Sequence, residues 1–284
     1  GRLLFVALFV ALVVALVVVS VVVRNIAPVL GIGPAALGLG AALWQRFSAS
    51  FGFRVALSPD GIRLHHGLLT TRAQTVPPGR VQAVRIAQPL LWRGKGWWRV
   101  EVNVAGYTGG GKDRDEGQEN LLLAVGTRDQ ALEVVRLAMP WLGDGSDDGD
   151  WLESVKAGLT GTGTEGGFTA SPSASRWLDP IGWRRHGVLV GPRALLARRG
   201  VIVRELDVVP HARTQSIALE QGPVQRRLGL ATFALHSTQG PVSPSVRHLG
   251  GADAASLLHE QARRARTARA DRTVEGDGRW MVRG

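Results

Sequence analysis

The stretch that comes closest to a catalytic motif lies at residues 106–112, which read GYTGGGK. A phosphate-binding loop of this pattern needs Ser or Thr directly after its lysine to hold magnesium, followed by an apolar helix. Here Asp113 stands in the Ser/Thr position and no apolar helix follows. The stretch is therefore rejected as a nucleotide site.

The other residue types that could do chemistry do not assemble into a motif either. The seven histidines show no metal-ligand spacing, and the adjacent His65 and His66 would point to opposite faces of a strand. Because the chain has no cysteine, thiolate and disulfide chemistry are excluded. The sequence therefore predicts a protein that is not an enzyme and that has no cofactor and no metal site.

The clearest pattern in the sequence is an internal repeat. Residues 75–88 read TVPPGRVQAVRIAQ and residues 208–221 read VVPHARTQSIALEQ, 133 positions later. The same register aligns residues 53–105 with residues 186–238 without a gap, and apolar positions coincide along it. Self-similarity of this kind indicates two copies of one folding unit.

Each copy has the pattern of several strands followed by one helix. In the first copy, strands are expected at about 68–76, 80–88, 98–105 and 120–125. Thr127 is expected to cap a helix, with Gln130 as its capping-box partner. The second copy has strands between 187 and 238, and Asp253 opens its helix. This order predicts a small bent sheet closed by a C-terminal helix.

Three stretches carry a specific resemblance. They are the Val-Pro-x-x-Arg-x-Gln phrase of both copies, QPLLWRGKGWWRVEV (88–102) with its counterpart QGPVQRRLGLATFAL (221–235), and WLDPIGWRR (177–185). Together they resemble the bacterial pleckstrin-homology (PH-like) module of membrane-anchored tandem-repeat proteins. The resemblance implies a fold of seven strands and a helix in each copy. It implies no known catalytic or ligand site.

The first 48 residues differ from the repeats. Leu3–Val23 is an uncharged apolar run of 21 residues, and Ile26–Trp44 is a second one. Each is long enough to cross a bilayer, and Leu3–Val23 is too long for the apolar region of a signal peptide. The runs have three arginines at their outer flanks and only Arg24 between them, which predicts that the rest of the chain is cytoplasmic. Because no methionine precedes Gly1, we expect a longer natural chain.

The predicted fold class is α+β, with a transmembrane helical hairpin followed by two PH-like β-barrel or sheet domains, each closed by a C-terminal helix. The domain boundaries are 1–48 for the hairpin, 52–140 for the first PH-like domain, 141–176 for an acidic linker rich in Gly, Ser and Thr, 177–270 for the second domain and 271–284 for a tail. The predicted localisation is the cell membrane, multi-pass.

The net charge of +11 lies largely in the second copy and favours an anionic partner. Candidate residues for binding anionic lipid headgroups or a protein partner are Arg198, Arg199, Arg204, Arg226, Arg227, Lys95, Trp97 and Trp98. The alternatives are a merely solvated basic face for the arginines and core packing for the tryptophans. Nucleic acid is not favoured, because no stacking aromatics accompany the arginines.

The repeated phrase supplies a second set of candidates, Pro77, Arg80 and Gln82 with Pro210, Arg213 and Gln215. The favoured interpretation is structural: the proline opens a strand, and the polar side chains satisfy loop carbonyls. The alternative is an arginine that grips a ligand.

These patterns favour a non-enzymatic integral membrane protein whose two cytoplasmic PH-like domains form a binding or scaffold module, with an oligomer possible. The alternative is an accessory subunit of a membrane export or envelope-stress complex.

Overall fold

The computed structural model describes residues 54–58, 61–66, 72–76, 78–105, 120–140, 148–238 and 240–274. The chain divides into two compact units, Gly1–Phe53 with His65–Arg72, and Arg54–Leu64 with Ala73–Gly284. Nearly all of the first unit lies outside the described residues. The second unit contains nearly all of both copies of the repeat.

The described part of the first copy consists of six strands and a helix. In chain order these are β1 (Arg54–Ser58), β2 (Gly61–His66), β3 (Arg72–Val76), the 3-10 turn η1 (Pro78–Arg80), β4 (Val81–Pro89), η2 (Leu90–Lys95), β5 (Trp98–Val104), β6 (Leu121–Gly126) and α4 (Arg128–Ala138). The helix begins with the predicted capping box: Thr127 Oγ1 accepts from the Gln130 amide at 3.3 Å, and the Thr127 amide donates to Gln130 Oε1 at 2.9 Å.

The second copy repeats this order after a short lead-in. The lead-in contains α5 (Asp148–Thr160), η4 (Glu165–Gly167), β7 (Thr169–Ala170), η5 (Ser173–Trp177) and η6 (Trp183–Arg185). The copy itself contains β8 (Gly187–Val190), β9 (Ala194–Arg199), β10 (Val203–Pro210), η7 (His211–Arg213), β11 (Ser216–Glu220), α6 (Pro223–Arg227), β12 (Leu230–His236), β13 (Ser245–Gly250) and α7 (Gly251–Val274).

Strand pairing follows the same register in both copies. Ile86 of β4 pairs with Val100 of β5, and Leu219 of β11 pairs with Phe233 of β12, so both partners move by 133 positions. The next strand pair carries an irregularity at the same place, after Trp98 in one copy and after the equivalent Ala231 in the other. The ungapped sequence alignment therefore corresponds to equivalent hydrogen-bonded ladders.

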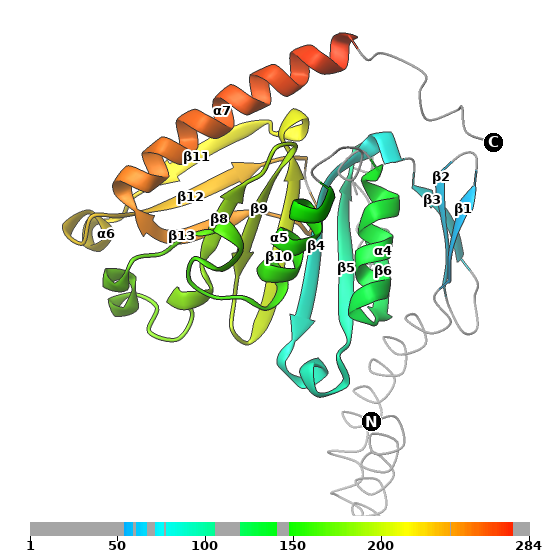
Figure 1. Cartoon of the computed structure of the whole chain (residues 1–284), viewed down its shortest axis with the longest axis horizontal. Helices are drawn as coiled ribbons and strands as arrows, with labels where there is room; N and C mark the ends of the chain where they lie inside the picture. Colours follow the sequence, from blue (N-terminus) through cyan, green and yellow to red (C-terminus); the bar gives the residue numbers. More distant parts are fainter. Residues whose placement is uncertain are drawn as a thin grey trace, which may run out of the picture. The chain divides into compact units, whose positions relative to one another are not determined.

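The copies are not separate in space. Half of each contributes to one seven-stranded sheet, with the order β6-β5-β4-β10-β9-β8-β7 (Figure 1). At its centre, β4 of the first copy pairs antiparallel with β10 of the second, from Val203 opposite Pro89 to Val208 opposite Val84. Two three-stranded sheets, β1-β2-β3 and β11-β12-β13, contain the remaining strands.

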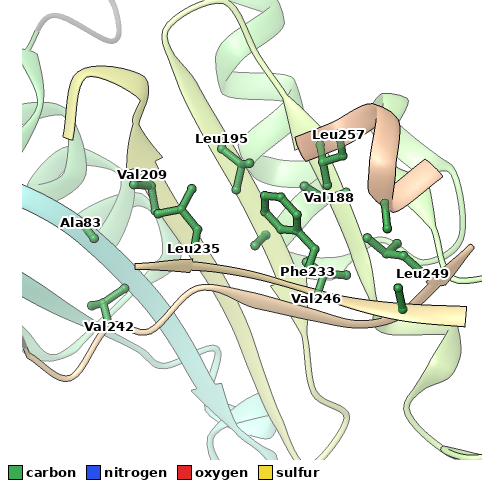
Figure 2. Close-up of a cluster of buried hydrophobic side chains, with 13 residues drawn as sticks. Ala83, Val188, Leu195, Val209, Phe233, Leu235, Val242, Val246, Leu249 and Leu257 are labelled. Carbon is green, nitrogen blue, oxygen red and sulfur yellow. The ribbon is translucent and has the colours of Figure 1, made fainter. Parts of the chain in front are cut away.

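The hydrophobic core of the second copy also receives a side chain from the first. Figure 2 shows Phe233, which is 1% exposed, among the side chains of the second copy's strands and of Leu257 from α7. The same cluster contains Ala83 of β4, next to Val209 and Val242. Because apolar burial is the main favourable term in folding, this continuity ties the two copies together energetically.

Residues 148–176 lie in the segment predicted as an acidic linker, and here the structure differs. Helix α5 packs on β9 and β10, with Val155 and Leu159 buried. A Cβ added at Gly158 would lie 2.7 Å from a Leu206 methyl carbon, so the helix sits directly against the sheet. Composition indicated a solvated tether because glycine and acidic residues dominate, but a few apolar positions suffice to dock a helix.

The predicted fold class needs a correction. Mixed α and β structure is present, but no helix in the described ranges is long and apolar enough to cross a membrane. The longest of these helices, α7, has 24 residues and carries a series of arginines. The transmembrane hairpin placed at residues 1–48 lies outside the described residues, and the structure gives it no support.

Candidate binding surface

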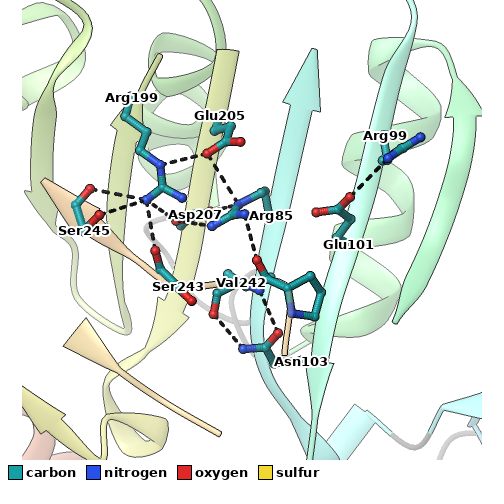
Figure 3. A network of polar contacts seen from close by, with 11 residues as sticks. Arg85, Arg99, Glu101, Asn103, Arg199, Glu205, Asp207, Val242, Ser243 and Ser245 are labelled. Carbon is teal, nitrogen blue, oxygen red and sulfur yellow. Dashed lines mark hydrogen bonds and ion pairs between the residues drawn. The ribbon is translucent and has the colours of Figure 1, made fainter. Parts of the chain in front are cut away.

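A network of buried charges crosses the junction between the copies (Figure 3). Arg85 of β4 lies directly opposite Asp207 of β10 and makes a two-pronged contact with its carboxylate, with Nε to Oδ1 at 2.6 Å and Nη2 to Oδ2 at 3.1 Å. Arg199 of β9 lies opposite Glu205 and contacts it at 2.8 Å, and it also reaches Asp207 at 3.0 Å. Three neighbouring strands are thereby linked on one face.

The network is largely withdrawn from water. The Asp207 side chain is fully buried, and that of Arg85 is 10% exposed. Burial opposes the charge on Arg85, but the hydrogen bond and the attraction of Asp207 outweigh it and raise the pKa of the guanidinium. The Arg85 guanidinium is therefore charged, and its contact with the Asp207 carboxylate offsets its desolvation.

The loop between β12 and β13 covers this network. Arg85 Nη1 donates to the carbonyl of Pro241 at 2.8 Å, and Arg199 Nη1 donates to that of Ser243 at 3.0 Å. Asn103 of β5 is buried and donates to the carbonyl of Val242 at 2.7 Å, while the Val242 amide donates back to Asn103 Oδ1 at 2.9 Å. The junction is therefore an interface between the copies that is held by specific side-chain hydrogen bonds.

One end of the seven-stranded sheet exposes apolar side chains from both copies. We call it the apolar–basic rim, formed by η2 and by the turn between β9 and β10. Leu90 is 52% exposed, Leu91 is 90% exposed and Ile202 is 72% exposed. Pro89, which precedes η2, pairs with Val203, so the two segments lie side by side. Single exposed apolar residues are common, but a cluster next to charges marks an interaction surface.

The rim is basic as well as apolar. Neither residues 89–99 nor residues 199–204 contain an acidic side chain. Arg93 donates to the carbonyl of Val201, which holds η2 against the turn, and Arg204 Nη1 contacts Gln88 Oε1 at 3.5 Å. Desolvation and the charge of Arg204 lower the pKa of Arg93. Lys95 is exposed at the end of η2.

Of the predicted binding residues, Arg198 needs a correction. Its side chain is buried, donates to the carbonyls of Gly163 and Glu165, and stacks on the Phe168 ring at 4.4 Å. Burial lowers its pKa to about 10. Arg198 therefore fastens the lead-in segment to β9 and does not face solvent. Its place in an Arg-Arg pair suggested a surface, but adjacent residues of a strand point to opposite faces.

Arg185, which the sequence did not single out, has a similar position. It is buried and donates to the carbonyls of Gly158, Leu159 and Gly161 at the end of α5. Burial and the charge of Arg198 lower its pKa to about 10. An arginine at the carboxyl end of a helix satisfies carbonyls that have no partner within the helix.

The other candidates fall in different places. Arg199 belongs to the junction network, and Arg204 belongs to the rim. Arg226 and Arg227 are exposed on α6, which connects β11 and β12 in another sheet. The basic residues therefore do not form one patch.

The two predicted tryptophans have different environments. Trp98 is 3% exposed and packs in the core. Trp97 is partly buried and meets Trp92 edge to face, with ring centroids 6.3 Å apart. Arg99 lies over the Trp92 ring at 5.6 Å, so these aromatic and basic groups stiffen η2 behind the exposed leucines.

Two side chains of the repeated phrase, Gln82 and Arg213, donate to backbone carbonyls. Gln82 is buried and donates to the carbonyl of Arg80, which is itself exposed. Arg213 donates to the carbonyl of Gly79 in the other copy, and Gln215 contacts Thr238 at 3.4 Å. Pro210 is buried at the end of β10, and Pro77 lies outside the described residues.

One further polar cluster joins Asp179, His186 and His248. Asp179 Oδ2 lies 2.8 Å from His186 Nε2, and the two imidazole rings meet edge to face at 6.3 Å. Burial lowers the pKa of His186 and of His248. No group of metal ligands was found among the described residues. A histidine–carboxylate pair alone does not define a reaction.

The sequence reasoning missed Leu90, Leu91, Ile202 and the Arg85–Asp207 pair. A signal for the pair was present, because Arg85 and Asp207 each lie between two apolar neighbours in the sequence. Such a charge at a core-facing position needs a partner. For the leucines and Ile202 there was no comparable signal, since an apolar residue in a turn does not show whether it is covered.

The comparisons with known proteins agree with this architecture. The family model of the bacterial PH domain matches residues 3–139 and 162–265, and each of these two regions contains most of one copy. The chain therefore belongs to the bacterial PH domain family, as a tandem pair. No curated protein and no solved structure matches the chain.

Two further predictions are corrected along with the fold class. The function as an integral membrane protein and the multi-pass localisation both depended on the transmembrane hairpin. Since the described part of the chain has no helix capable of spanning a membrane, neither prediction is supported. What the family match supports is the presence of PH-like domains, a class that generally binds lipids or proteins.

Proposed function

We propose that this tandem PH unit is a non-catalytic binding module and that its apolar–basic rim docks on an anionic lipid surface. The observation that carries the proposal is the exposure of Leu90, Leu91 and Ile202 beside Arg93, Lys95 and Arg204, without an acidic residue in either segment. Aliphatic side chains that enter the headgroup region, flanked by cations that meet lipid phosphates, are typical of interfacial binding.

The energies involved are sufficient for reversible docking. A basic residue near an anionic leaflet contributes about 1 kcal/mol. Burying an exposed leucine or isoleucine side chain contributes roughly 1.5–3 kcal/mol when burial is complete. Partial insertion of three such side chains, together with two or three cations, gives a favourable free energy of binding. This free energy is only modestly larger than the free-energy cost of orienting the protein on a surface.

The junction favours this proposal because it positions the rim. Leu91 comes from the first copy and Ile202 from the second. The β4·β10 ladder, the Arg85–Asp207 contact and the hydrogen bond from Arg93 to Val201 hold the two segments together. A rigid pair of turns loses little conformational entropy on docking, which leaves more of the interaction energy for affinity.

The absence of cysteine from the sequence allows a direct test. Leu91→Cys in the full chain is labelled with an environment-sensitive fluorophore and mixed with vesicles of anionic or neutral lipid. The label is expected to shift its emission to the blue with anionic vesicles only. The shift should fade as salt rises, because the Debye length falls from about 10 Å at 0.1 M to about 3 Å at 1 M.

The matched control is the equivalent turn of the second copy. Val224→Cys places the label on α6, where the parent side chain is 54% exposed and two arginines follow. This label is expected to stay in water. Adding Lys95→Gln and Arg204→Gln to Leu91→Cys should weaken the anionic-vesicle response by about tenfold or more. An unshifted Leu91 label, or one that responds equally to neutral vesicles, contradicts the proposal.

A further inference from the structure

The internal repeat gives each strand of the junction an equivalent in the other copy. With the 133-position register, β4 is equivalent to β11, and β10 is equivalent to β3. β4 and β10 pair with each other at the centre of the seven-stranded sheet. β11 and β3 each stand at the end of a three-stranded order, so among the described residues neither has a neighbour on the equivalent edge.

The exposure of β11 reflects this open edge. In β4, Val84 and Ile86 are fully buried, whereas at the equivalent positions of β11 Ile217 is partly buried and Leu219 is 38% exposed. The backbone groups along an open strand edge are unpaired and form a template for another strand. Within the chain, the equivalent edge of β4 is paired with β10. The strand of the first copy that is equivalent to β10 is β3.

We propose that β11 accepts β3 of a second copy of this chain, antiparallel and in the register of the β4·β10 junction. Asp207 lies opposite Arg85 in that junction, and Glu205 lies opposite Ala87. Transferring the register places Gln74 of one copy opposite Ala218 of the other, and Arg72 opposite Glu220. The Arg–Asp pair is lost, but an opposite-charge pair takes its place two residues along the same ladder.

This pairing is weaker than the junction that it copies. It lacks the buried Arg85–Asp207 contact and depends on backbone hydrogen bonds, the Leu219 side chain and the Arg72–Glu220 pair, a cross-strand contact worth about 0.2–1 kcal/mol. Its two sides are different surfaces, so it is heterologous and can continue from chain to chain. We therefore expect reversible, concentration-dependent self-association.

A second copy is the occupant that the structure favours. It presents the equivalent of the strand that already fills this position inside the chain, and its charges complement those of β11. The proposal does not depend on lipid docking, because the rim and the β11 edge belong to different sheets.

Disulfide trapping tests the register. Full chains carrying Ala218→Cys are mixed with full chains carrying Gln74→Cys under mild oxidation, and directly opposed strand residues have Cα atoms about 4.5–5.5 Å apart, within reach of a disulfide. A disulfide-linked dimer of the two variants is expected. The matched control mixes Leu219→Cys with Gln74→Cys, which shifts the register by one residue and should trap much less.

Charge reversal tests the occupant. Glu220→Lys should weaken association by roughly tenfold, since an attractive cross-strand pair becomes a repulsive one. Arg72→Glu should do the same, and a mixture of the two variants should restore trapping at 218 and 74. Glu133→Lys, at an exposed position of α4, is the control for net charge and should change nothing.

Either of two results would overturn the proposal. Equal trapping in the register-shifted control would mean unspecific collisions. Dimers of Ala218→Cys with itself, without trapping to Gln74→Cys, would mean that two β11 edges pair with each other about a twofold axis.

Discussion

At the scale of single residues, the buried pair of Arg85 and Asp207 carries the largest electrostatic consequence. Asp207 has no exposed surface, and two guanidinium groups contact it. Both side chains are withdrawn from water, so each depends on its charged partners: Asp207 on Arg85 and Arg199, and Arg85 on Asp207 and Glu205. The pair contributes specificity of register as well as energy, because only one alignment of β4 and β10 brings the two side chains opposite each other.

Asp207→Ala is expected to lower the free energy of unfolding by about 3–5 kcal/mol, since it removes the nearest counter-charge of the buried Arg85 and leaves only the more distant Glu205, at 3.8 Å. Arg85→Met combined with Asp207→Leu should recover most of that loss. The control is Glu153→Ala, which removes an exposed pair with Lys156 and should cost at most about 1 kcal/mol. Urea unfolding of the four proteins measures these differences; equal losses for Asp207→Ala and Glu153→Ala would contradict the prediction.

His211 gives a prediction about pH. It lies in η7 with 1% exposure, and Nε2 contacts the carbonyl of Gly191 at 2.9 Å. Burial lowers its pKa below the ordinary 6.5, although the Gly191 carbonyl and nearby Glu260 oppose this shift and Arg264 adds to it. The unfolded chain therefore binds the proton more readily. The contribution of His211 to the free energy of unfolding is therefore fully present above about pH 6.5, and it is lost as the pH falls below that value.

His211→Gln removes this titration, so its thermal midpoint is expected to change less than that of the parent between pH 7.5 and pH 5.5. His259→Gln, at an exposed position of α7, serves as the control and should keep the parent's profile. A parent-like fall in the His211→Gln midpoint would show that other groups cause the acid sensitivity.

At the scale of elements, glycine in the left-handed region determines two of the turns. Gly229 precedes β12 at φ 64°, and Gly200 joins β9 to β10 at φ 77°. A Cβ at Gly229 would meet nothing within 4 Å, whereas one at Gly200 would overlap the carbonyl oxygen of Val203. The two positions share a backbone conformation and differ in the space around them.

Gly229→Ala is expected to cost about 1–2 kcal/mol, the penalty for a side chain in the left-handed region. Gly200→Ala should cost clearly more, because the β9–β10 turn must also move to relieve the overlap. Since Ile202 lies in that turn, we expect the same change to weaken the vesicle response of a labelled Leu91→Cys chain. Chemical denaturation compares the two variants, and similar losses would contradict the steric part of the argument.

At the scale of the whole molecule, the composite sheet makes the two copies one cooperative structure. The β4·β10 ladder, the shared charge network and the core contact of Ala83 all cross between them. Tandem domains joined only by a linker unfold independently, but a continuous core and sheet do not permit that.

We therefore expect β4 and β10 to lose protection from hydrogen exchange together as denaturant rises. Peptides covering 81–89 and 203–210 report the two strands in one mass-spectrometric experiment. Asp207→Ala should lower the protection of both by a similar amount, while Thr127→Ala, which removes the cap of α4, should act mainly on the first copy. Two separate transitions in the parent protein would show that the junction does not couple the copies.

Much of the architecture follows from the sequence alone. The ungapped repeat predicts two equivalent copies, and the strands at 80–88, 98–105 and 120–125 agree with β4, β5 and β6. Thr127 and Gln130 form the predicted capping box. These features are local, because alternation, turn residues and helix caps depend on residues that are close together in the sequence. The equivalent strand register in the two copies follows from the constant spacing of the repeat.

Only the tertiary structure decided which strands become neighbours and which charges become buried. β4 and β10 pair through backbone N–H and C=O groups, which every strand edge presents. No pattern of residue types therefore predicts that these two strands become neighbours. Arg198 and Arg226 look alike in the sequence, yet one stacks on Phe168 inside the protein and the other faces water. Their environments differ because burial is set by segments distant along the chain: the lead-in packs over Arg198, whereas Arg226 is exposed on α6.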